Sequence, residues 1–207
     1  MPSPEQLFQQ LLKKLRPTLV QQGFRRKGQN FVAESPECWG LINFQKSIYS
    51  PATEKNFTVN LAIAAKRVML FYEESIAQAP RYYASHWVIR IGELIPEHRD
   101  RWWTLSTEAS YGPIASAVEK HICELAAPII RTHLTEEGLI ALWNSKHFGG
   151  FEYPILKYKS ILFAERGEFE KLPAIFERIL EICHGGPAQV GADEHIAHMR
   201  RRYHQIQ

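Results

Sequence analysis

Two histidines near the C-terminus come closest, in type and spacing, to a metal site. His195 and His198 are three residues apart, so on a helix they would share one face, as metal ligands can. The pattern H-E-x-x-H is absent from the sequence, and a third ligand would have to come from another segment. The sequence therefore favours two solvated histidines. We predict no metal and no cofactor, with metal binding by this pair as the open alternative.

A cysteine beside a histidine could supply a nucleophile and its base, but the spacing does not fit. His121 and Cys123 are two residues apart and would not face each other on a helix. Cys38 and Cys183 fit small buried side chains. Sequence patterns for acyl transfer or phosphate binding, such as G-x-S-x-G and G-x-G-x-x-G, do not occur. The sequence leans against an enzyme.

Two basic clusters, Arg25–Lys27 and Arg200–Arg202, could meet the phosphates of a nucleic acid. The chain has 25 Lys and Arg against 22 Asp and Glu, a formal net charge of +3, so its overall field does not favour nucleic acid as a partner. A protected edge strand and a solubilising tail explain the clusters as well. Weak nucleic-acid binding stays an alternative that requires both clusters on one face.

The segment Cys38–Ser47, CWGLINFQKS, changes from apolar to polar along what should be one strand. Alternation places Asn43 and Gln45 opposite Ile42 and Phe44. Lys46 would follow the apolar pair at the rim of the core face. We interpret the polar positions, together with residues of neighbouring strands and a tryptophan anchor, as a recognition surface. Its predicted residues are Asn43, Gln45, Lys46, Asn60, Arg90 and Trp102, with Trp103 as an alternative anchor. A structural network of hydrogen-bonded side chains is the competing interpretation.

Periodicity predicts the elements that position these residues. Apolar spacing indicates an amphipathic helix from Pro4 and a central helix after Pro113. Aromatic and β-branched residues predict three strands between Phe24 and Ala65, and two more over residues 87–105. The predicted class is α+β, with an antiparallel sheet of about five strands packed with N-terminal and central helices, followed by an all-helical C-terminal extension.

We predict two domains, an α+β domain over residues 1–132 and a helical extension over 133–207. Residues 156–182 resemble one tetratricopeptide-type hairpin with Gly167 at its turn. Such arrays need about three repeats to bury a continuous core, so this hairpin would dock on the first domain or on another subunit.

Several segments between Gly23 and Leu105 resemble the bacterial DUF family 4304: GFRRKGQNFVAE, WGLINFQKS, FTVNLAI, RIGELI and WWTL. With the flanking helices, the resemblance covers residues 1–132, approximately. It implies a fold, since the family has no assigned function, and it carries over no catalytic residue.

The remaining expectations concern place and role. The start of the sequence lacks signal-peptide features, no apolar run is long enough for a membrane span, and the three cysteines are widely spaced. We therefore predict a cytoplasmic bacterial protein without a membrane partner. Its predicted role is a non-enzymatic protein-binding module, of an immunity or accessory type, with self-association left open. The alternative is an enzyme or nucleotide-binding protein whose site is the polar sheet face, with Glu93 as acid or base.

Overall fold

The computed structural model describes residues 2–96, 100–145 and 150–206, which form two compact units. The first unit comprises Met1–Ala65 and Ala77–Phe148. The second comprises Lys66–Ile76 and Gly149–Gln207. A short stretch from the middle of the sequence thus belongs with the C-terminal helices. The predicted division into domains at residue 133 stays a prediction.

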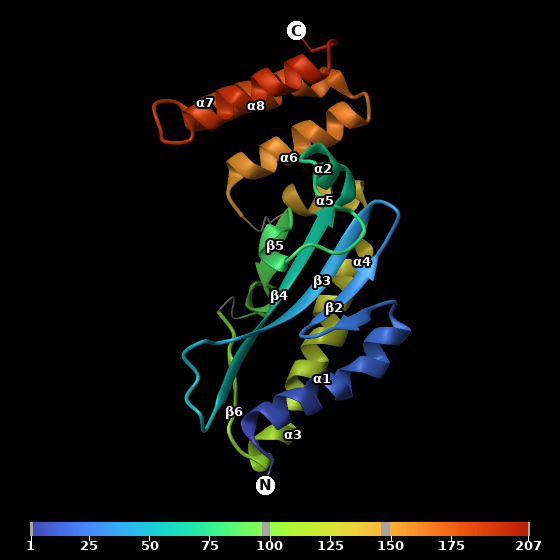
Figure 1. Ribbon diagram of the computed structural model, residues 1–207, viewed down its shortest axis with the longest axis vertical. Helices are drawn as coiled ribbons and strands as arrows, with labels where there is room; N and C mark the ends of the chain where they lie inside the picture. The colour runs from blue at the N-terminus through green and yellow to red at the C-terminus, as the bar shows by residue number, and fades with distance from the viewer. Residues whose placement is uncertain (1, 97–99, 146–149, 207) are drawn as a thin grey trace. The chain divides into compact units, whose positions relative to one another are not determined.

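In the described residues, the first unit contains a six-stranded antiparallel sheet (Figure 1). The strand order is β1-β2-β3-β4-β5, and β6 pairs with the start of β4. This confirms the predicted α+β class with an antiparallel sheet. The strands are β1 (Arg25–Lys27), β2 (Asn30–Glu34), β3 (Cys38–Lys46), β4 (Lys55–Ala65), β5 (Trp87–Arg90) and β6 (Trp103–Leu105).

The first expected strand is a hairpin of two. A tight turn separates β1 from β2, with Lys27 paired to Asn30. Gly28 in this turn has φ of +63°, a left-handed conformation that glycine adopts at little steric cost. The turn therefore reverses the chain where the sequence pattern indicated one continuous strand.

Helices cover one face of this sheet (Figure 1). The first begins at the capping box expected from the sequence, in which the Gln6 N–H donates to Ser3 Oγ (3.2 Å) and the Ser3 N–H donates to Gln6 Oε1 (2.7 Å). A π-helical segment, Ile122–Ala126, joins two later helices into one continuous run. The helices are α1 (Pro4–Gln21), α3 (Glu108–His121), α4 (Ala127–Thr132) and α5 (Glu136–Trp143).

Apolar packing holds these helices to the sheet. The ring of Phe8 in α1 lies 5.3 Å from that of Phe57 in β4, in an edge-to-face arrangement, and both are buried. Gly40 of β3 faces α4 so closely that an added Cβ would lie 2.4 Å from Ile130 Cγ2. The covered face of the sheet is therefore the one to which Gly40 and its alternate neighbours point.

The second unit is helical, as expected for the C-terminal region. Its elements are α2 (Lys66–Phe71), α6 (Glu152–Glu165), α7 (Leu172–Cys183) and α8 (Gln189–Arg202). Gly167, with φ of +75°, lies in the turn between α6 and α7. Phe71 joins α2 to α8, because its ring packs against His198 (5.0 Å) and Arg202 (4.8 Å).

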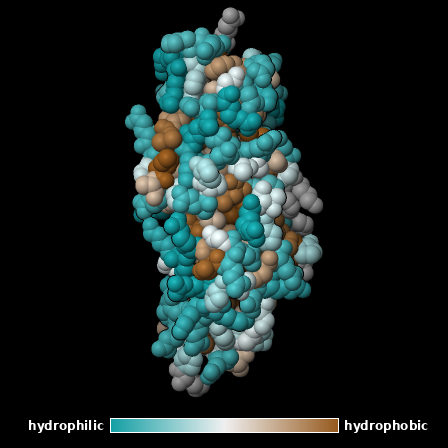
Figure 2. All heavy atoms as spheres, turned by 90° about the vertical axis from the view of Figure 1, so that its right-hand side faces the viewer, coloured by the Kyte–Doolittle hydropathy of each residue, from teal (hydrophilic) through white to brown (hydrophobic). Residues whose placement is uncertain are grey.

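The surface shown in Figure 2 is mostly hydrophilic. Apolar residues appear there as separate small groups among hydrophilic ones. That side of the molecule therefore does not present a single broad apolar patch of the kind that marks a large permanent interface.

Candidate functional site on the polar sheet face

Polar residues lie in one row across four strands. In the sheet register, Asn43 of β3 pairs with Asn30 of β2 on one side and Asn60 of β4 on the other. Asn60 in turn pairs with Arg90 of β5. Paired residues point to the same face, and this face lies opposite the one that α1 and α4 cover. We call it the polar sheet face.

Hydrogen bonds join the amides of this row. Asn43 Nδ2 donates to Asn30 Oδ1 (2.6 Å). Asn60 Nδ2 donates both to Asn43 Oδ1 (3.1 Å) and to Gln45 Oε1 (2.9 Å). Asn60 is only 2% exposed, so its hydrogen bonds join β3 and β4 in the interior of the protein. We call Asn30, Asn43, Gln45 and Asn60 the amide row.

Two chain segments lie over the amide row. The first, Ala77–His86, contacts β1 where Lys27 Nζ donates to Gln78 Oε1 (3.0 Å), and contacts β3 where the Tyr82 hydroxyl donates to Gln45 Oε1 (3.0 Å). The second precedes β6 and is held by buried Thr58, whose Oγ1 donates to the Arg101 carbonyl (2.6 Å). Both segments are therefore anchored to polar side chains of the sheet.

At the edge of this covering, three side chains reach solvent. Arg90 forms an ion pair with Asp100, and Trp102 Nε1 donates to Asp100 Oδ2 (2.9 Å). The Arg90 guanidinium carbon lies 5.3 Å from the centroid of the Trp102 ring, a cation–π geometry. Trp102 is 36% exposed. We call Arg90, Asp100 and Trp102 the rim cluster.

The neighbours of Asp100 favour the ionised form of its carboxyl group. Burial opposes its ionisation, but hydrogen bonds from Trp102 and Arg90 and the positive charge of Arg90 outweigh it and lower the pKa of this carboxyl. The rim cluster is thus a fixed arrangement of one cation, one anion and one aromatic ring at neutral pH.

The structure places two further candidates elsewhere. Lys46 lies on the helix-covered side, where its Nζ is 3.3 Å from Glu5 and 5.7 Å from the centroid of Phe8. Trp103 is buried in the core and stacks on Phe57 at 5.6 Å. Of the predicted residues, the polar sheet face therefore brings together Asn43, Gln45, Asn60, Arg90 and Trp102.

Sequence reasoning missed three members of this site, Asn30, Tyr82 and Asp100. Alternation along β2 would have placed Asn30 on the polar face once the hairpin turn at Gly28 was recognised. Asp100 stands two residues before Trp102 in a segment without a regular pattern. Its pairing with Arg90 depends on how that segment returns to the sheet, for which the sequence offers no signal.

The histidine pair divides between the interior and the surface of the second unit. His195 is buried, its Nε2 lies 2.8 Å from Ser160 Oγ, and burial lowers its pKa to about 3. His198 is exposed and packs on Phe71. The expectation of two solvated histidines is therefore wrong for His195. Within the described ranges, no group of three His, Cys, Asp or Glu side chains could hold a metal ion.

The two basic clusters belong to different units. Arg25 pairs with Glu34 across the β1–β2 hairpin (3.0 Å), and Arg26 donates to Gln9 of α1 (2.9 Å). Arg202 pairs with Glu165 (3.3 Å) in the second unit. Part of each cluster is therefore engaged in local structure.

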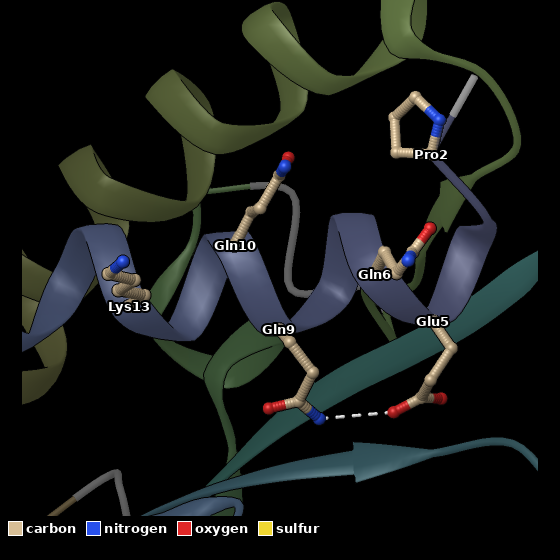
Figure 3. A pocket seen from close by; sticks show the side chains of 6 residues that line it. All are labelled: Pro2, Glu5, Gln6, Gln9, Gln10 and Lys13. Carbon is tan, nitrogen blue, oxygen red and sulfur yellow. Dashed lines mark hydrogen bonds between the residues drawn. The ribbon is translucent and has the colours of Figure 1, made fainter.

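A groove of about 570 Å³ runs along α1, away from the polar sheet face. Figure 3 shows Glu5 and Gln9 on one side of the helix, where Gln9 Nε2 donates to Glu5 Oε1 (3.0 Å), and Gln10 on the other. Burial opposes ionisation of Glu5, but Gln9, Lys46 and Lys55 lower its pKa. The lining residues are Pro2, Glu5, Gln6, Gln9, Gln10 and Lys13. They offer amides and opposite charges but no nucleophile.

Comparison with known proteins gives a family. The model of the family described as domain of unknown function DUF4304 matches residues 15–132. The chain belongs to the DUF4304 family. The matched part of this DUF4304 protein includes all six strands, the amide row and the rim cluster. No curated protein and no solved structure matches the chain. None of the helices in the described residues combines the length and apolar character needed to cross a membrane.

Proposed function

We propose that this DUF4304 protein is a non-enzymatic protein-binding module whose recognition surface is the rim cluster. The observation that supports it is the joint fixation of Arg90, Asp100 and Trp102 at the edge of a hydrogen-bonded sheet face. Tryptophan and arginine are the side chains that dominate the energetics of protein interfaces.

The amide row serves this surface as a rigid base. Asn60 is hydrogen-bonded to Asn43 and Gln45 and neighbours Arg90 in the register. A side chain already held in its bound geometry loses less conformational entropy on binding. The rim cluster is therefore suited to a partner that presents an apolar group to Trp102 and hydrogen-bonding groups to Arg90 and Asp100.

The segment Ala77–His86, which lies over the amide row, also presents a basic and an aromatic side chain. Tyr83, on the segment over the amide row, is 61% exposed and accepts a hydrogen bond from Arg81 (2.5 Å). The Arg81 guanidinium carbon lies 5.9 Å from the ring of Tyr83. A partner that spans the covering segment would meet a second pairing of arginine with an aromatic ring.

We favour a binding module over an enzyme at this site, because the carboxylate of Asp100 is engaged by Arg90 and Trp102. Arg90 pairs with Asp100, and Glu93 lies exposed in the short helical turn Ile91–Leu94.

We place the binding module in the bacterial cytoplasm, consistent with three free cysteines. An immunity or accessory role and self-association fit the same surface.

Affinity capture tests the proposal. The tagged wild type, Trp102→Ala and a control, Val20→Ala, would be incubated with lysate of the source organism, and retained proteins quantified by mass spectrometry. Val20 is 50% exposed on α1, outside the rim cluster. We expect a partner that wild type and control retain and Trp102→Ala loses. Equal retention by all three, with equal melting temperatures, would refute the rim cluster as the recognition surface.

A further inference from the structure

Lys157 of α6 lies between two tyrosine rings of the second unit. Its Nζ is 5.5 Å from the centroid of Tyr153, one helical turn earlier, and 5.8 Å from that of Tyr72, which follows α2. In the residues that the structure describes, Lys157 Nζ forms no hydrogen bond and no ion pair. A half-buried ammonium thus lacks a counter-ion.

Several other lysines of this protein have carboxylate partners. Lys14 Nζ lies 2.5 Å from Glu119, and Lys55 Nζ lies 3.5 Å from Glu5. Lys171 is the closest comparison, because it also lies over an aromatic ring, that of Phe163 at 4.6 Å, yet it pairs with Glu168. Lys157 also lies beside aromatic rings, but in the described residues it has no paired carboxylate.

Acids lie near the two tyrosines, Glu74 near Tyr72 and Asp193 and Glu194 near Tyr153, but among the described residues none of them pairs with Lys157. Its own carbonyl accepts a hydrogen bond from Ser160 Oγ (2.7 Å), which lies 2.8 Å from Nε2 of the buried, neutral His195. The two tyrosine faces hold the amine in a half-buried position, and burial lowers the pKa of Lys157. A lysine of which a larger fraction is unprotonated at neutral pH is a better nucleophile.

We propose that Lys157 is a site of covalent acylation by small acyl donors of the acyl phosphate class. The lone pair of the neutral ε-amine attacks the acyl carbon and forms the N–C bond. The C–O bond to phosphate breaks, phosphate leaves with the electron pair, and the nitrogen releases one proton to solvent. The product is a neutral amide, which removes a positive charge that the aromatic pair holds without a counter-ion.

The test is the rate of acetylation of the full-length protein by acetyl phosphate at pH 7.5, followed site by site with mass spectrometry. We expect Lys157 to react about fivefold faster than the exposed Lys13 and Lys120, because a modest loss of bound proton multiplies the neutral amine fraction. In urea the three rates should become equal. A rate for Lys157 equal to or below that of Lys13 in the folded protein would overturn the proposal.

Two variants sharpen this result. Tyr72→Ala removes one ring and admits water, so acetylation of Lys157 should slow to the rate of Lys13. Leu180→Ala, on the exposed side of α7, is the matched control and should leave the rate unchanged. An unchanged rate in a folded Tyr72→Ala variant would also contradict the proposal. If Tyr72→Ala does not fold, the comparison of Lys157 with Lys13 in the wild type decides alone.

Discussion

On β3, Ile42 and Phe44 point to the helices, whereas Asn43 and Gln45 point to the chain segments that lie over the polar sheet face. Ile42 and Phe44 are fully buried by apolar side chains. Asn43 and Gln45 are partly buried and joined by hydrogen bonds. At these four positions of β3, the hydrophobic effect stabilises one face of the strand, and hydrogen bonds between side chains stabilise the other. The first stabilises the fold, and the second fixes the shape of a surface.

The largest expected effect is on the helix-covered face. Phe44→Ala removes a buried ring that lies 5.9 Å from Phe31 and leaves a cavity, so the free energy of unfolding should fall by about 3–5 kcal/mol. Urea unfolding followed by circular dichroism measures it, with Phe44→Leu, which removes less of the side chain, as the milder control. A loss below about 1 kcal/mol would show that this face does not carry the core.

We expect a smaller loss in the free energy of unfolding when a residue of the polar sheet face is replaced. Asn60→Ala leaves the oxygens of Asn43 and Gln45 without the donor that joins them, so unfolding should become easier by about 1–3 kcal/mol. The double variant with Asn43→Ala should lose less than the sum of both single changes, because the two residues interact. Strict additivity in the same urea assay would mean that the amide row is not a coupled network.

The pH dependence of stability tests a buried polar group at the end of the sheet. His86 Nδ1 accepts the Ala65 N–H (2.9 Å), and burial lowers its pKa from 6.5 to about 3. Between these values the unfolded state binds more protons at this residue, so the contribution of His86 to stability is complete above pH 6.5 and is lost below it by about 1.4 kcal/mol per pH unit.

Urea midpoints at pH 7.5 and pH 5 measure this slope. His86→Asn should show a shallower loss between the two pH values, since it cannot take up the proton. His184→Asn, at an exposed position of the second unit, serves as the control and should match the wild type. Identical slopes in the wild type and His86→Asn would exclude His86 as the source of acid sensitivity.

The smallest expected effect on stability is at the rim cluster. Arg90→Gln breaks a largely exposed ion pair with Asp100, and such pairs contribute below about 1 kcal/mol. Binding of the partner, in contrast, should weaken about tenfold or more, which corresponds to about 1.4 kcal/mol. Calorimetric titration and thermal melting on the same sample separate the two. A large loss of stability with unchanged affinity would contradict our account, because Arg90 would then stabilise the fold and would not contribute to binding.

Much of the fold follows from local pattern. Alternation in Phe57, Val59 and Leu61 revealed β4 and its core face, and the capping box at Ser3 marked the start of α1. Those signals lie within a few residues of each other. The hairpin turn at Gly28 went unnoticed because a single glycine within a strand-like run is also compatible with a bulge.

The site was harder to predict than the fold. Asn43, Gln45, Asn60 and Arg90 came from alternation, and their common row came from a register that the strands' apolar patterns impose. The partner of Arg90 was not predictable, because Asp100 reaches it through an irregular segment. The grouping of α2 with the C-terminal helices depends equally on long-range packing, which no local pattern encodes.

Hydrogen exchange of backbone amides with and without the captured partner tests the central claim most directly. Our account predicts slower exchange on binding in residues 81–90 and 100–105, around the rim cluster, with the Trp102→Ala variant showing no such change at the same partner concentration. Unchanged exchange in both segments, with protection confined to α1 or to the second unit, would contradict recognition through the polar sheet face.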